Sequence, residues 1–250
     1  MKRVGLVVAY DGTNYSGWQI QPNGITIQGV LNDALTDLLG EKIEIMGASR
    51  TDAGVHALGN VAVFDTNTRI PGEKISYALN QRLPEDIVIQ SSKQVADDFH
   101  PRHCDCRKTY EYDILNRTFP LPAYRNTAYF LYGTLNIEAM RRACQAFLGE
   151  HDFASFCAAG AQVQTTVRKI YSLEVECRPL TEAGTPVPPA SGEAVNAADG
   201  KHGEQVQQAQ SASGEMLNAA AGESDEQVQQ AQPESGAVSY THLTLPTNSL

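Results

Sequence analysis

Cysteine pairs and long apolar runs are what this 250-residue sequence has least of. Its five cysteines are an odd number and none lies in a Cys-x-x-Cys pair, which excludes a complete disulfide framework and suits a reducing compartment. The amino-terminal apolar run, residues 4–10, is too short for a signal peptide and continues directly into Asp11. No stretch approaches transmembrane length. The sequence therefore predicts a cytoplasmic protein without a membrane partner.

Positive charge is nearly absent from the carboxyl-terminal end. Residues 181–250 hold nine acidic side chains and one basic side chain, so this segment carries −8 of the chain's net charge of −10. Residues 1–180 are close to neutral, with 18 Lys and Arg against 20 Asp and Glu, so the acidic total does not exclude a nucleic-acid partner for them. Their basic clusters are either phosphate contacts or ordinary solvated faces: Arg102, Arg107–Lys108, Arg141–Arg142 and Arg168–Lys169.

Residues 181–237 form a low-complexity acidic segment that we expect to be disordered. Residues 191–198 closely recur at 213–220, and residues 204–210 recur at 226–232, both after 22 positions. The segment has almost no aromatic side chains to bury, and two copies are fewer than a solenoid needs. The last stretch, residues 238–250, resembles the translation of a transposon-end sequencing adaptor, which predicts that it is not native coding sequence.

Residues 1–105 predict an α+β domain that carries the most informative loop of the chain. Thr26 is suited to cap a helix over 27–39, and Gly40 is suited to end it. The other expected elements follow from alternating or helical apolar spacing: strands at 3–10, 42–46, 60–66 and from 87, and a second helix at 75–83. This is the split βαβ order of ferredoxin-like domains.

Residues 106–180 predict a second, incomplete ferredoxin-like half. A strand is expected at 109–115, a helix from an Asn136 cap through Leu148, a loop at 151–156 and a strand at 168–177. The half then stops, which would leave an unpaired sheet edge.

The loop of residues 47–56, Gly-Ala-Ser-Arg-Thr-Asp-Ala-Gly-Val-His, joins two expected strands. In an extended backbone, Arg50 and Asp52 would project to the same side, and the guanidinium would favour an ionised carboxylate. One interpretation is a turn with a surface ion pair. The other is a charged, accessible carboxylate for chemistry, held on a rigid scaffold. His56 is interpreted as structural.

A second cluster, His100, His103, Cys104 and Cys106, contains zinc-ligand types within seven residues. Structural zinc sites usually draw two pairs from separate segments, and no second pair with suitable spacing follows. We therefore expect a basic loop that enters a strand, and no metal.

Three motifs together resemble the tRNA pseudouridine synthase A family. They are Tyr10-Asp11-Gly12-Thr13-x-Tyr15-x-Gly17-Trp18-Gln19, Arg50-Thr51-Asp52-Ala53-Gly54-Val55-His56 and Arg107-Lys108-Thr109-Tyr110-Glu111-Tyr112. Their order and spacing match the family from Lys2 to about Cys177, and Phe99-His100 and His151–Phe156 also fit. Nothing after Leu180 resembles the family's second-domain segment, so we expect a chain truncated at its carboxyl end.

The resemblance implies an enzyme that isomerises uridine to pseudouridine at positions 38, 39 and 40 of the tRNA anticodon stem-loop without redox cofactor or metal, and a homodimer for the complete family member. It also implies that the two halves form one mixed sheet with helices on one face. Asp52 takes the place of the catalytic aspartate, attacking either ribose or base. Tyr110 takes that of the substrate-contacting tyrosine, and Arg50 that of the arginine near the aspartate.

Two other functions remain open from the sequence. One is a fragment that binds tRNA without turnover because its second half is incomplete. The other is a hydrolase that uses the Asp52 carboxylate, for which the sequence offers no visible base partner.

Overall fold

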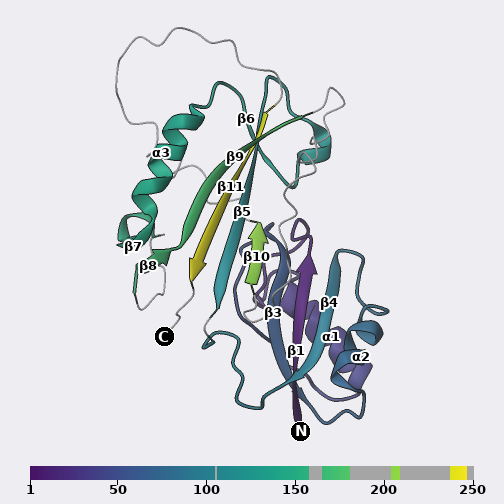
Figure 1. Ribbon diagram of the computed structural model, residues 1–250. Coiled ribbons are helices and arrows are strands. Elements are labelled where there is room, and N and C mark those ends of the chain that lie inside the picture. Colours follow the sequence, from purple (N-terminus) through teal and green to yellow (C-terminus); the bar gives the residue numbers. More distant parts are fainter. Residues whose placement is uncertain (105, 158–164, 181–203, 209–236, 247–250) are drawn as a thin grey trace, which may run out of the picture. The chain divides into compact units, whose positions relative to one another are not determined.

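The computed structural model describes residues 1–104, 106–157, 165–180, 204–208 and 237–246, which fall into two compact units (Figure 1). The first unit contains Met1–Thr109 and the strand Glu204–Gln208, and the second runs from Tyr110 and includes the strand Ala237–Pro246. Within the described ranges, no helix is long and apolar enough to span a bilayer. Of the tail that the sequence predicts to be disordered, residues 181–237, the structure describes only the strand Glu204–Gln208 and Ala237. The rest of this prediction lies outside the described residues.

The first unit has the predicted strand–helix–strand–strand–helix–strand order. Its elements are β1 (Lys2–Tyr10), α1 (Ile27–Leu39), β2 (Met46–Gly47), β3 (His56–Thr66), α2 (Gly72–Leu79), β4 (Ile87–Val95) and β10 (Glu204–Gln208). The antiparallel sheet has the order β4-β1-β3-β10, and β2 also pairs with β3. The α+β class is thus confirmed.

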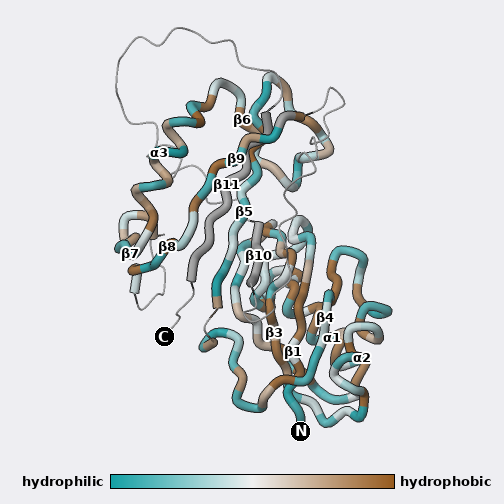
Figure 2. Tube along the Cα trace, in the orientation of Figure 1, coloured by the Kyte–Doolittle hydropathy of each residue, from teal (hydrophilic) through white to brown (hydrophobic). Residues whose placement is uncertain are grey.

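Both helices cover the same face of this sheet. Period-2 alternation along β1 turns Val4, Leu6 and Val8 to that face, where they pack against apolar side chains of α1 and α2. Figure 2 shows the apolar character concentrated along β1 and β3. Since all these side chains are nearly inaccessible, burying them is the main stabilising contribution to the unit.

Helix α1 has the predicted limits, whereas the strand expected at 42–46 is wrong except at its last residue. Thr26 Oγ1 accepts from Gly29 N, and Gly40 ends the helix in the left-handed conformation at φ 67°. In the segment before β2, backbone N–H groups donate to side chains of α1 instead of to a neighbouring strand. Ile43 N donates to Thr36 Oγ1 at 3.2 Å and Ile45 N to Asn32 Oδ1 at 2.8 Å. Helix α2 begins three residues before its predicted start and ends at Leu79, before the predicted end at 83.

The second unit is built on a mixed sheet. Its elements are β5 (Arg107–Asn116, with its first residues in the other unit), η1 (Pro122–Tyr124), β6 (Tyr129–Leu131), α3 (Ile137–Phe147), β7 (Gly149–Asp152), η2 (Ala154–Phe156), β8 (Val167–Ile170), β9 (Ser172–Pro179) and β11 (Ala237–Pro246). The order is β5-β11-β9, β6 pairs parallel with β5, and β7 pairs with β8. Helix α3 packs its Met140, Cys144 and Phe147 against Ile170, Leu173 and Val175.

Three details of this unit differ from the sequence prediction. The loop expected at 151–156 begins as the end of strand β7 and continues as the 3₁₀ turn η2. The strand expected at 168–177 is divided at Tyr171 into β8 and β9. The expected open edge is occupied, because β11 runs antiparallel to β9 from Ala237 opposite Pro179 to Thr244 opposite Ser172.

Asp113 on β5 makes the stability of the second unit depend on pH. Burial and the charge of Glu111 raise its pKa to about 7, against the opposing effect of Arg178, and its Oδ1 has no hydrogen-bond partner among the described residues. The unfolded carboxyl has a pKa of about 4. Between these two values the folded chain binds more protons than the unfolded chain, so stability falls as pH rises through this window.

We therefore expect Asp113→Asn to unfold several degrees above the parent chain at pH 8 and not above it at pH 4. Scanning calorimetry at both pH values measures the difference, with the exposed Asp33→Asn as a control that shifts neither. An equal change in unfolding temperature at both pH values would contradict the dependence of stability on the Asp113 carboxyl.

Candidate active site

Residues 48–55, between β2 and β3, alternate between anchored and exposed side chains. Ser49, Thr51 and Val55 are buried, while Arg50 and Asp52 are exposed. The backbone is fixed by Ala48 N donating to Val61 O at 2.8 Å and by Trp18 N donating to Thr51 O at 3.0 Å. The loop thus presents two charged side chains to solvent from a backbone that the sheet and its neighbouring loop hold in place.

Residues 48–55 are called the Asp52 loop below. The loop of residues 11–17 packs under it so closely that two glycines are required. A Cβ on Gly12 would lie 2.0 Å from Val55 O, and one on Gly17 would lie 2.4 Å from Thr51 O. Gly17 also has φ 85°, which disfavours any side chain. The contact explains why a Gly-rich motif precedes the Asp52 loop in the sequence.

Two polar pairs fix the 11–17 loop itself. The buried ring of His56 places Nδ1 3.0 Å from Asp11 Oδ1, in line with the structural role expected for His56. Burial raises the pKa of Asp11, but hydrogen bonds from Thr13 and the charge of His56 outweigh it and leave the pKa lowered. Tyr15 donates to Asp86 Oδ1 at 2.6 Å, and its carbonyl accepts from Gly54 N at 3.3 Å.

Among the ion pairs of the described residues there is none between Arg50 and Asp52, which disfavours the interpretation of the loop as a turn with a surface ion pair. Both side chains are exposed on either side of the buried Thr51, as expected for extended spacing, and a turn with Val55 N donating to Asp52 O at 3.2 Å follows Asp52. Arg50 lies instead near Arg102, which donates from Nε to Gly47 O at 2.9 Å. Burial and the charge of Arg50 together lower the pKa of Arg102.

Tyr110 lies on β5 as the first residue of the second unit, with its side chain half-buried. The structure therefore places Arg50 and Asp52 on one loop of the first unit, and Tyr110 on another unit.

Several basic side chains of the predicted clusters are engaged within the protein. Lys108 is buried, Arg141 donates to Val175 O and pairs with Glu138, and Arg168 donates to two backbone carbonyls. The His100 and His103 rings lie 4.2 Å apart, and the described residues contain no group of three side chains suited to hold a metal ion.

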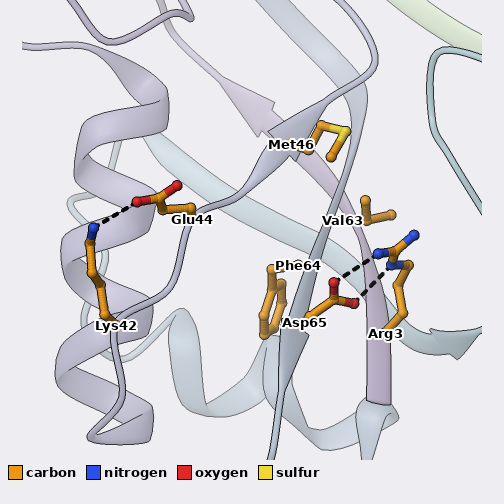
Figure 3. Close-up of a pocket in the computed structure, with 7 residues that line it drawn as sticks. All are labelled: Arg3, Lys42, Glu44, Met46, Val63, Phe64 and Asp65. Atoms are coloured by element: carbon orange, nitrogen blue, oxygen red, sulfur yellow. Dashed lines mark hydrogen bonds and ion pairs between the residues drawn. The ribbon is translucent and has the colours of Figure 1, made fainter. Parts of the chain in front are cut away.

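A shallow pocket of about 260 Å³ is lined by residues of β1, β2, β3 and the segment before β2 (Figure 3). Its charges are already compensated, because Arg3 pairs with Asp65 at 2.7 Å and Lys42 with Glu44 at 2.7 Å. None of Arg50, Asp52 and Tyr110 lines it. The exposed Asp52 loop is therefore the better candidate site.

A family model described as tRNA pseudouridine synthase matches residues 6–103 and 143–187. The tRNA pseudouridine synthase A of Thermoanaerobacter sp. strain X514 is 50% identical over 176 residues, covering 70% of this chain and 72% of the relative. The chain belongs to the tRNA pseudouridine synthase A family. This is a family of isomerases, which confirms the predicted enzyme class and disfavours the hydrolase.

Other members of the family show similar agreement. The tRNA pseudouridine synthase A of Acetivibrio thermocellus is 48% identical over 176 residues, 70% of this chain and 72% of the relative. That of Caldicellulosiruptor bescii is 44% identical over 181 residues, 71% of this chain and 74% of the relative. The family model's match includes the Asp52 loop, whereas Tyr110 lies in the unmatched stretch between its two segments.

The sequence interpretation missed the residues beneath the loop. Tyr10 and Asn60 are buried there, next to Thr51 and Ser49. The signal was available for Tyr10, because the alternation of Val4, Leu6 and Val8 along β1 continues to it and buries a phenol that needs a partner.

The surroundings of Gly17 and Gly54 predict that alanine substitution destabilises the protein by different amounts at the two positions. Gly17→Ala should lower the free energy of unfolding by about 2–4 kcal/mol, because it adds overpacking to a left-handed conformation. Gly54→Ala, at φ 80° with open space around it, should lower it by about 1–2 kcal/mol. Urea denaturation measures both, and equal losses would contradict the close approach at Gly17.

Proposed function

We propose that this chain isomerises uridine to pseudouridine at positions 38, 39 and 40 of the tRNA anticodon stem-loop, with Asp52 as the nucleophile. The observation that carries the proposal is an exposed carboxylate on an anchored loop, in a chain that belongs to the tRNA pseudouridine synthase A family. An anchored loop favours chemistry because it limits the geometries that the carboxylate can adopt.

The reaction is a balanced rearrangement. The bond between N1 of uracil and C1′ of ribose breaks, the base turns, and C5 bonds to C1′. The proton on C5 leaves and N1 gains a proton, so no electrons are gained or lost and no redox cofactor is needed. Asp52 can assist by covalent attack either on the ribose or on the base.

Arg50 and Tyr110 are the other two residues that we propose to contact the substrate. Arg50 is exposed on the same loop, where its guanidinium can take the place of the base in the stack and contact backbone phosphates. Arg102, which donates to Gly47 O and whose pKa the charge of Arg50 helps to lower, adds a second positive charge near the loop. Tyr110 offers a flat face to uracil and a hydroxyl at its end.

Tritium release from tRNA labelled at uridine C5 tests the proposal. We expect release by this chain, loss of at least about a thousandfold in Asp52→Ala because the nucleophile is gone, and parent activity in Asp33→Ala, which removes an exposed acid on α1. Stem-loops that carry a single uridine at position 38, 39 or 40 show which positions react.

Each outcome of this assay has a meaning. Tritium release that survives Asp52→Ala would refute the role of Asp52 as nucleophile. Release from uridines at other positions would refute the assignment to positions 38, 39 and 40. Binding of the stem-loop without any release would favour the binding-only alternative. Tyr110→Phe and Arg50→Ala should lower turnover while Asp52 remains in place, since both act on substrate.

A cytoplasmic homodimer is part of the same proposal and rests on family membership. We expect sedimentation equilibrium of the purified chain to give twice the 27.1 kDa of one chain. A single-chain mass at all concentrations up to about 100 times that of the activity assay would contradict it.

A further inference from the structure

A chain of buried hydroxyl and amide groups runs under the Asp52 loop. Tyr10 Oη lies 2.9 Å from Thr51 Oγ1. Asn60 Nδ2 lies 3.5 Å from Tyr10 Oη and donates to Ser49 O at 3.2 Å. Exposed fractions are 5% for Tyr10, 7% for Thr51 and 0% for Asn60, so water does not compete for these contacts. Asn60 Nδ2 donates to the Tyr10 hydroxyl, and in the contact between Tyr10 and Thr51 either hydroxyl can be the donor.

The network starts from the paired strands β1 and β3 of the first unit. Tyr10 ends β1 and Asn60 lies in β3, and these strands are paired, with Val8 opposite Asn60. The Tyr10 ring also packs on Trp18 at 5.9 Å between centroids, and Trp18 N donates to Thr51 O. Thr51 is therefore held through both its hydroxyl and its carbonyl.

Thr51 is the residue between the two exposed charges. Arg50 and Asp52 flank it directly, so a rotation of its backbone would move both side chains. If the two buried hydroxyl groups lost their contact, they would be left without hydrogen-bond partners. This cost strongly disfavours other conformations of the loop. Burial also raises the pKa of Tyr10, against the opposing effect of its hydrogen bonds with Thr51 and Asn60, and so favours the neutral phenol.

We propose that Tyr10 and Thr51 are positioning residues, whose hydroxyl contact fixes the backbone that carries Asp52, with Asn60 orienting the phenol. The functional half of this proposal rests on the role proposed for Asp52. The structural half, restraint of the loop, stands by itself and can be measured without activity.

The test compares variants that remove single hydroxyl groups from the full chain. Thr51→Val and Tyr10→Phe each delete one partner and keep the shape, Thr51→Ser keeps the hydroxyl, and Ser92→Ala removes a buried hydroxyl that bonds Gly72 O instead of this loop. Hydrogen exchange of the amides of residues 48–55 is measured against those of β1 and β3. Turnover of tRNA is measured as kcat and KM separately.

Thr51→Val and Tyr10→Phe should each accelerate exchange in 48–55 about tenfold while strand amides change little. They should lower kcat about 10- to 100-fold with KM within about twofold, because misplacement affects the reacting geometry more than binding. The double variant should lose no more than the worse single one, as expected of one shared contact. Thr51→Ser should restore both readouts, and Ser92→Ala should leave both unchanged.

Unchanged exchange in the loop would overturn the proposal, as would a loosened loop with unchanged kcat. Uniform acceleration in loop and strands would also overturn it, because that is general destabilisation. Failure of the proposed function looks different: the parent chain shows no release, or Asp52→Ala remains active. In that case the exchange experiment alone decides whether Tyr10 and Thr51 restrain the loop.

Discussion

The site depends on one constraint: Thr51 is buried while both of its sequence neighbours are exposed. Its carbonyl is held by Trp18 N and its hydroxyl by Tyr10, and the close approach of Gly17 leaves no room for the loop to settle deeper. A charged side chain on a surface loop is ordinarily mobile. Here the neighbouring residue supplies the rigidity, and Asp52 keeps its access to solvent.

That constraint in turn requires the sheet of the first unit. Tyr10 and Asn60 reach the loop only because β1 and β3 pair in register, and the strands keep that register because Val4, Leu6 and Val8 must face the helices. The apolar packing on one face of the sheet thus determines the position of polar groups at its end. Fold stability and site geometry are linked through the same two strands.

Much of the fold follows from local patterns in the sequence. Helix α1 has its predicted limits because Thr26 and Gly40 satisfy its ends by local hydrogen bonds and local backbone conformation. The strand expected at 42–46 is wrong because alternation at Lys42–Met46 does not reveal that Asn32 and Thr36 would take its backbone donors. The division at Tyr171 and the pairing of β9 with a segment about 60 residues later likewise depend on distant partners.

For the site, the sequence by itself identified the residues that we propose for the chemistry: an acid, Asp52, and a neighbouring base, Arg50, within a Gly-rich loop of a recognisable family. Only the tertiary structure decided how they are held. It disfavoured the interpretation as an Arg50–Asp52 ion pair, brought Arg50 near Arg102, and placed Tyr10 and Asn60 beneath the loop. The physical reason is that residue types and spacing are local, whereas burial and hydrogen-bond partners arise when β1 and β3 meet.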